Sequence, residues 1–172
     1  GSIGAVIGHE MGHGFDDKGS KYDGDGELRN WWTESDREEF EKRTKKLIEQ
    51  YDNYKVVDGT PVNGEFTQGE NIGDLAGIVI AYKAYQLSKK GKEAPIIDGL
   101  TGDERFFYGW GTIWGVKSTD KQLIRQIKTD PHSPGEFRAN GPLVSMPEFV
   151  ELFKVTKNDG MYVDPSDRVK IW

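Results

Sequence analysis

The chain has 172 residues, a length that suits one domain and leaves no room for two ordinary ones. Asp and Glu outnumber Lys and Arg by 29 to 23, and this net charge of −6 offers no basic excess for nucleic-acid binding. No apolar run approaches the roughly 18 residues of a membrane span, and the lack of cysteine excludes disulfides and thiolate metal sites.

The chain opens with apolar residues at helical spacing, which are Ile3, Val6, Ile7 and Met11. This pattern predicts a first helix. Two histidines share one of its faces and apolar residues cover much of the rest, so the helix needs to be buried nearly all round and requires packing partners outside residues 1–172. Without them, we expect this chain to expose apolar surface or to associate with such a partner. Residues 16–30 are rich in Gly, Asp and Lys and are expected to form a loop.

A second helix and a small hairpin are expected next. Ser35 and Glu38 have the spacing of a capping box, which predicts the start of a helix that ends near Tyr54. Residues 56–64 contain an Asp-Gly and an Asn-Gly pair. Because both pairs favour tight turns, this segment is predicted to be a small β-hairpin.

The second half of the chain is also predicted to be mostly helical. A third helix is expected from residue 70 to about residue 89, with Gly91 as its left-handed cap. Glycines interrupt the pattern of residues 103–128, which argues against one straight helix there. The three prolines of residues 130–142 predict a loop, and residues 146–153 predict a short helix. The fold class is therefore mainly α with a small β-hairpin.

The strongest chemical signal is the segment His9-Glu10-Met11-Gly12-His13. Residues four apart share a helical face, so both imidazoles can reach one ion. Catalytic zinc takes about three protein ligands and a water, and Glu10 stands where it could accept the proton of that water. A helix with two structural histidines and a surface glutamate is the alternative, but the segment contains two of the three histidines in the chain, which favours the zinc interpretation.

A third ligand has to come from elsewhere in the sequence. An extended pattern with a third histidine six residues after His13 fails, because that position is Gly19 and position 16 is Asp16. Glu70 and Asp74 are four residues apart on the third predicted helix. Glu70 could bind zinc while Asp74 accepts the other N–H of a ligating imidazole. Two acids would also suit the first turn of a helix without any metal.

Together these segments resemble the neprilysin family of zinc endopeptidases, and in particular its bacterial, endopeptidase O-like members. The resemblance covers the whole chain, and the segments that carry it, in the family's order, are residues 6–17, 30–33, 69–77, 130–134 with 137–138, and 171–172. It implies a thermolysin-like zincin (gluzincin) fold. It also implies that residues 1–172 are the carboxy-terminal catalytic part of a longer enzyme.

The resemblance implies a metal centre and a general base. His9, His13 and Glu70 would hold one Zn²⁺ per chain, and Glu10 would activate the zinc-bound water. The implied activity is the hydrolysis of peptide bonds in oligopeptides by a zinc-dependent endopeptidase.

Four further residues have roles that the resemblance implies. Asp74, counted with the catalytic set, would orient one zinc histidine, and Asp16 would orient the other. His132 would stabilise the oxyanion of the tetrahedral intermediate, and Arg138 would donate to a backbone carbonyl of the substrate. Both last roles suit fixed donors that face developing negative charge or an acceptor.

The expected partners are peptide substrates and the missing amino-terminal half of the enzyme, with no nucleic acid and no membrane segment in this chain. A bacterial, cytoplasmic location is expected, with secretion or the cell surface left open. One alternative is a non-catalytic zinc-binding or partner-binding module, against which the intact Glu10 argues. Another is a calcium-binding loop at residues 23–27, which lacks the required glycine and closing glutamate.

Overall fold

The computed structural model describes residues 1–172 and contains only helices, turns and loops. The α-helices are α1 (Ile3–Gly12), α2 (Glu34–Asp52), α3 (Gly64–Ser88), α4 (Gly102–Ile113), α5 (Asp120–Thr129), α6 (Gly135–Asn140) and α7 (Pro147–Leu152). Short 3-10 helices cover His13–Phe15, Gly19–Lys21 and Leu143–Ser145. None of the helices combines the length and apolar character that a bilayer crossing requires.

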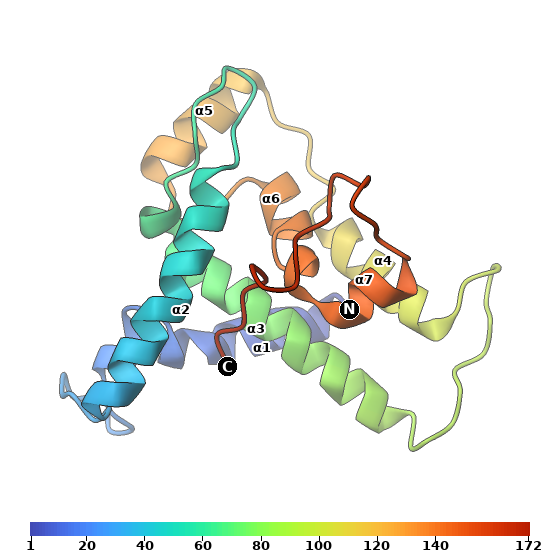
Figure 1. The fold of residues 1–172 in the computed structure, drawn as a ribbon, viewed down its shortest axis with the longest axis horizontal. Coiled ribbons are helices and arrows are strands. Elements are labelled where there is room, and N and C mark those ends of the chain that lie inside the picture. Colours follow the sequence, from blue (N-terminus) through green and yellow to red (C-terminus); the bar gives the residue numbers. More distant parts are fainter.

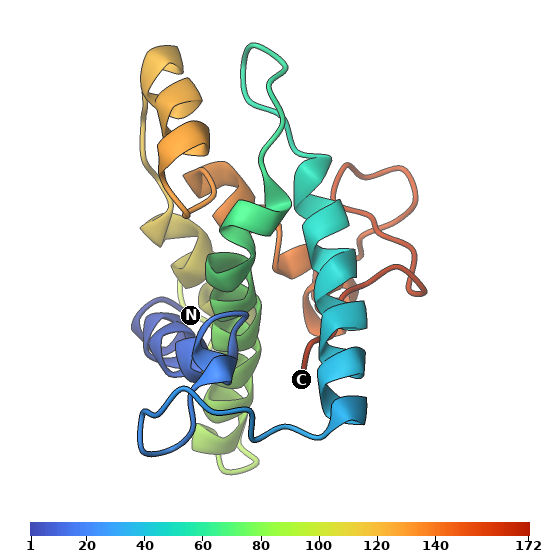
Figure 2. The same cartoon turned by 90° about the vertical axis from the view of Figure 1, so that its left-hand side faces the viewer.

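The long helix α3 is the central element of the fold (Figure 1). It stands between α1 on one side and α2 on the other in Figure 2, and both of these helices pack on it. The shorter helices α4, α6 and α7 contact one another directly or through the turn 143–145. The elements that carry the predicted ligands, α1 and α3, are therefore in direct contact.

Two apolar cores flank α3. The first lies between α2, α3 and the last residues of the chain, and includes Phe40, Leu47, Ile72, Val169 and Ile171. The second joins α1, α3, α4 and α7, and includes Ala5, Ile78, Phe106, Trp110 and Phe149. Because both cores use α3, its position is held from two sides by apolar packing.

Helix α1 approaches α3 through small residues. Ala5, Gly8 and Gly12 are buried on its inner face. A Cβ atom on Gly8 would lie 2.9 Å from the Cα atom of Gly77, and one on Gly77 would lie 2.7 Å from the backbone nitrogen of His9. No side chain larger than a hydrogen fits at this crossing.

Within residues 1–172, helix α1 exposes apolar surface, as expected for this chain in the absence of further packing partners. Its large apolar residues face outward, since Ile3 is 71% exposed, Ile7 55% and Met11 70%. The reason is the close crossing with α3, which accepts only the small residues of α1. The outer face of α1 is thus an exposed apolar stripe, which we define as Ile3, Val6, Ile7 and Met11.

The second helix begins earlier than predicted. Thr33 is its N-cap, because the Thr33 hydroxyl oxygen accepts a hydrogen bond from the backbone N–H of Asp36 at 3.1 Å. The predicted capping box of Ser35 and Glu38 is therefore wrong by two residues. A hydroxyl at position 33 satisfies the free N–H groups of the first turn before Ser35 is reached.

The predicted β-hairpin is not confirmed. Residues 55–62 make a tight turn with one isolated bridge between Lys55 and Pro61, too short to form strands. Asn63 instead caps α3, and its side chain accepts from the backbone N–H of Phe66 at 2.9 Å. Helix α3 consequently begins at Gly64 and not at residue 70.

Three expectations for the second half of the chain have different outcomes. The predicted interruption of residues 103–128 is confirmed, because α4 and α5 are separate helices. The predicted loop at 130–142 is wrong in its second half, which contains α6. The carbonyl of Pro134 accepts from the backbone N–H groups of Phe137 and Arg138 and so starts this helix. The short helix within 146–153 is confirmed as α7.

Gly77→Ala should separate α1 from α3. Because the added methyl group would overlap the α1 backbone, we expect a loss of about 1–3 kcal/mol in the free energy of unfolding. Gly111→Ala is the matched control, since a Cβ atom at this helical glycine meets open space. It should leave stability unchanged or raise it by about 0.5–1 kcal/mol. Chemical denaturation measures both, and equal effects of the two changes would contradict the proposed close crossing.

A polar contact between the end of α3 and the start of α4 should depend on pH. Asp103 accepts from Tyr82 at 3.0 Å, Gln86 at 3.2 Å and Lys89 at 3.1 Å. Burial opposes ionisation of Asp103, but these three donors lower the pKa of its carboxyl. Because the pKa of Asp103 is lower in the folded chain than in the unfolded chain, where it is about 3.9, its ionised form stabilises the fold at pH values above about 3.9. This stabilisation is lost as the pH falls through the lower pKa of the folded chain.

Asp103→Asn should therefore lower the melting temperature at pH 7, and the difference from the unchanged chain should shrink below about pH 4. Thermal unfolding followed by circular dichroism from about pH 7 down to about pH 2, which reaches below the folded pKa, measures it. A difference that stays constant over this range would show that the charge of Asp103 does not contribute.

Candidate metal centre

Two imidazoles and one carboxylate converge where α1 crosses α3. His9, His13 and Glu70 each offer one ligand atom, and the three atoms lie within 4.8 Å of one another. The Nε2 atom of His9 is 3.1 Å from Oε2 of Glu70, and Nε2 of His13 is 3.8 Å from Oε1. Two imidazole nitrogens and a carboxylate oxygen are a donor set that suits zinc.

The opposite nitrogen of each imidazole is held by an aspartate. Nδ1 of His9 donates to Asp74 at 2.8 Å, and Nδ1 of His13 donates to Asp16 at 2.8 Å. Asp16 is fixed in turn by the backbone N–H groups of Lys18 and Gly19. These contacts turn both Nε2 atoms toward Glu70, which is the arrangement that histidine ligands of a metal ion need. The residues present therefore fit a divalent cation.

The buried carboxylate of Asp74 also accepts hydrogen bonds from Arg138. Its side chain is 1% exposed, and it accepts from Nε and Nη2 of Arg138, each at 2.7 Å. The guanidinium of Arg138 lies over the ring of Trp114, 4.2 Å from the centroid. Asp74 thus fixes both an imidazole of the metal cluster and the guanidinium next to it.

His132 reaches the same cluster from the loop before α6. Its Nε2 atom lies 3.0 Å from Oε2 of Glu70, and its Nδ1 donates to Asp130 at 2.7 Å. The loop is attached to α3 because the Ser133 hydroxyl donates to the buried Asn71 side chain at 2.9 Å. Sequence reasoning missed Asp130, Asn71 and Ser133 as supporting residues. The acid two residues before His132 was a signal that could have found the first of them.

Hydrogen bonds on both sides of the His9 ring favour its protonated form. Burial alone would lower the pKa of His9, but hydrogen bonds to Asp74 and Glu70 outweigh it and raise the pKa to about 9. Burial likewise opposes ionisation of Glu70, yet His9, His132 and His13 together hold its pKa below the usual value. The cluster therefore gathers imidazole nitrogens around one carboxylate, in the place where a metal cation would bind.

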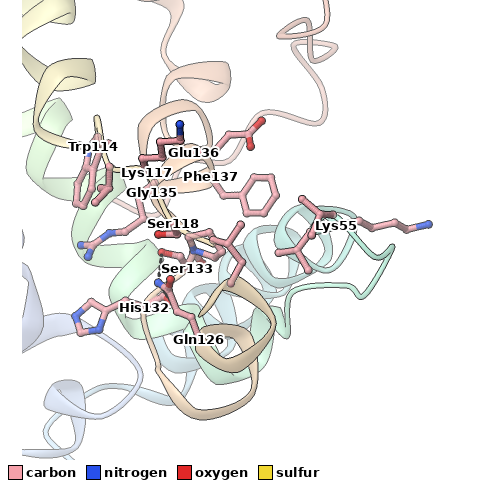
Figure 3. Close-up of a pocket in the computed structure, with 16 residues that line it drawn as sticks. Lys55, Trp114, Lys117, Ser118, Gln126, His132, Ser133, Gly135, Glu136 and Phe137 are labelled. Carbon is pink, nitrogen blue, oxygen red and sulfur yellow. Dashed lines mark hydrogen bonds between the residues drawn. The ribbon is translucent and has the colours of Figure 1, made fainter. Parts of the chain in front are cut away.

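A hollow of about 620 Å³ adjoins the loop that carries His132. Figure 3 shows the His132 imidazole turned away from Phe137 and Lys55, while Trp114 borders the hollow on the same side as His132. His132 thus both lines this hollow and contacts Glu70 of the metal cluster. Both apolar side chains and the cations Lys55 and Lys117 line the hollow.

The structure brings together seven of the eight predicted site residues through the contacts described above. The eighth, Glu10, follows His9 on α1 and is exposed to solvent. The alternative calcium loop is a solvated turn. The Asp23 side chain accepts the backbone N–H groups of Asp25 and Glu27 and pairs with Arg29 at 2.8 Å, so its oxygens already have partners.

Comparisons with known proteins find relatives that match this chain over its whole length. The chain is 43% identical over 175 residues to endothelin-converting enzyme 1 of Homo sapiens and 44% identical over 179 residues to neprilysin-1 of Caenorhabditis elegans. These matches cover 100% of this chain but only 22% and 23% of those proteins. The chain therefore spans less than a quarter of the curated relatives it matches.

Solved structures agree in fold as well as in sequence. The Mycobacterium tuberculosis zinc metalloprotease Zmp1 with an inhibitor superposes with a TM-score of 0.96 and 56% identity, over 99% of this chain and 27% of that one. PepO from Lactobacillus rhamnosis superposes with a TM-score of 0.85 and 34% identity, over 99% and 25%. The model of peptidase family M13 matches residues 1–169. The chain belongs to peptidase family M13, the neprilysin family.

Proposed function

We propose that this chain carries the metal centre of a zinc-dependent endopeptidase that cleaves oligopeptides, with one Zn²⁺ per chain. The observation that carries the proposal is the convergence of His9, His13 and Glu70 while Asp74 and Asp16 hold the far sides of the two imidazoles. Supporting it, Zmp1, which is 56% identical, is described as a zinc metalloprotease.

Several residues of the chain are proposed to carry separate steps of the reaction. Bound Zn²⁺ would act as a Lewis acid and lower the pKa of a water. Glu10 accepts the proton of the attacking water and later passes it to the leaving amine. His132, oriented by Asp130, donates to the carbonyl oxygen as negative charge develops on it. Arg138 has N–H groups left after binding Asp74, and these hold a backbone carbonyl of the peptide.

The rest of an M13 polypeptide is proposed to complete the substrate site. The chain spans 22% of endothelin-converting enzyme 1, and the exposed apolar stripe of α1 is a surface that an adjoining part of the protein would cover. We place this chain in the carboxy-terminal part of such an enzyme. A bacterial source is proposed from the 56% identity to the Mycobacterium tuberculosis protein. The expected cytoplasmic location stays a prediction.

Removing one ligand should abolish metal binding, and removing the base should not. Glu70→Ala takes away the only carboxylate of the cluster, so elemental analysis should find about one zinc in the purified chain and almost none in this variant. Glu10→Gln keeps all three ligands and should retain the zinc. Peptide cleavage by this variant should fall by about 100-fold or more, because it has no general base.

The two measurements separate the outcomes. Zinc without cleavage of a quenched peptide by the unchanged chain would mean that the metal centre assembles but that the rest of the enzyme is needed to hold substrate. No zinc in the unchanged chain, or equal zinc in Glu70→Ala, would contradict the proposed ligand set. Full cleavage by Glu10→Gln would contradict its role as the base.

A further inference from the structure

A second concave site lies on α2, across α3 from α1. It is a hollow of about 340 Å³, which we call the basic hollow, lined by Glu39, Lys42, Arg43, Lys46, Arg168, Val169 and Lys170. Five of these seven residues are cations and one is an acid, so the local charge is 5 − 1 = +4, in a chain whose net charge is −6. Positive charge is therefore gathered at this place against the overall charge of the protein.

Backbone carbonyls hold three of the cations in position. Arg43 donates through Nη1 to the carbonyl of Ile171 at 2.9 Å, and Lys46 donates to that of Ser166 at 3.1 Å. Arg168 donates through Nε to the carbonyl of Val163 at 3.1 Å. Arg carries five N–H donors and Lys three, so each side chain keeps unused donors. Because these long side chains are already ordered, less conformational entropy is lost when a ligand binds.

The single acid leaves the hollow positive. Glu39 lies 2.9 Å from Arg43 and 3.5 Å from Lys42, and both contacts are between exposed side chains. One carboxylate can balance only one of the five cations. Lys46, Arg168 and Lys170 have no carboxylate partner within ion-pair distance in the structure.

The lining also indicates what kind of ligand fits. Val169 is the only apolar residue among the seven, so the hollow lacks the apolar centre of a protein-docking surface. Its volume is at the lower end of the roughly 300–1,000 Å³ of small-molecule sites. The guanidinium of Arg168 uses only Nε, so its Nη1 and Nη2 groups remain as a planar pair of donors that matches phosphate oxygens. Arg43 keeps N–H groups beyond those that bind Glu39 and the Ile171 carbonyl.

We propose that the basic hollow binds a compact polyanion that carries two or more phosphate groups. A soluble oligophosphate and a phosphate-bearing lipid headgroup share this chemistry. The site is independent of the metal centre, so the proposal does not rest on the peptidase function.

Titration of the chain with tripolyphosphate tests the proposal. Calorimetry at about 0.05 M salt should detect saturable binding that weakens at least tenfold by about 0.3 M salt, because mobile ions screen exposed charges. The zinc content is measured after each titration, so that loss of metal is not mistaken for binding. The absence of saturable binding at the lower salt concentration would overturn the proposal.

Charge-reversal variants locate the binding. Lys46→Glu and Lys42→Glu should each weaken tripolyphosphate binding by about tenfold or more, which corresponds to about 1.4 kcal/mol. Lys42 is 74% exposed, so its replacement should not disturb folding even if that of Lys46 does. Lys45→Glu is the matched control, because Lys45 is an exposed residue of the same helix outside the hollow.

The control should change the affinity by less than about twofold. An equal loss in Lys45→Glu and Lys42→Glu would indicate attraction by overall charge and would overturn the proposal. Vesicles of phosphatidylcholine with and without cardiolipin, an anionic lipid whose headgroup carries two phosphates, distinguish the sources of phosphate. Binding to the anionic vesicles with the same order of variants would assign a lipid headgroup, and binding to tripolyphosphate alone would assign a soluble ligand.

Discussion

The crossing of α1 and α3 at glycine is the constraint on which the site depends. Glu70 and Asp74 lie 61 and 65 positions along the chain from His9, so only a tertiary contact can bring them together. The added Cβ atoms at Gly8, Gly73 and Gly77 would all overlap the other helix or the His9 ring. Because the backbones touch there, side chains that leave α1 and α3 beside the crossing are within ligand distance of one another.

One buried carboxylate makes the site and the fold interdependent. Asp74 accepts hydrogen bonds from His9 on α1 and Arg138 on α6, while it is itself part of α3. A carboxylate whose side chain is only 1% exposed is tolerated in the folded chain only if it is paired and fully hydrogen-bonded. The same contacts that orient the imidazole therefore also help to determine where three helices lie. A substitution of Asp74 would therefore change both the free energy of unfolding and the geometry of the metal ligands.

The local patterns of the sequence predict the site residues better than they predict how the helices pack. The spacing of His9 and His13, and of Glu70 and Asp74, is a property of a single helix, so it can be read without knowing what the helix touches. The outward orientation of Ile7 and Met11 depends on the close approach of Gly77, which lies far away in the sequence. The start of α3 at Gly64 and the existence of α6 were missed because short-range caps outweighed the glycine and proline content.

The segment at residues 169–171 has a consequence for how the protein is made. Val169 and Ile171 complete the core formed by Phe40, Leu47 and Ile72, and Arg43 donates to the carbonyl of Ile171 across 128 positions of sequence. A chain that emerges from the ribosome can therefore form α2 and α3 early, but it cannot close this core until residue 171 has left the exit tunnel. During that interval the inner faces of both helices are open to water and to chaperones.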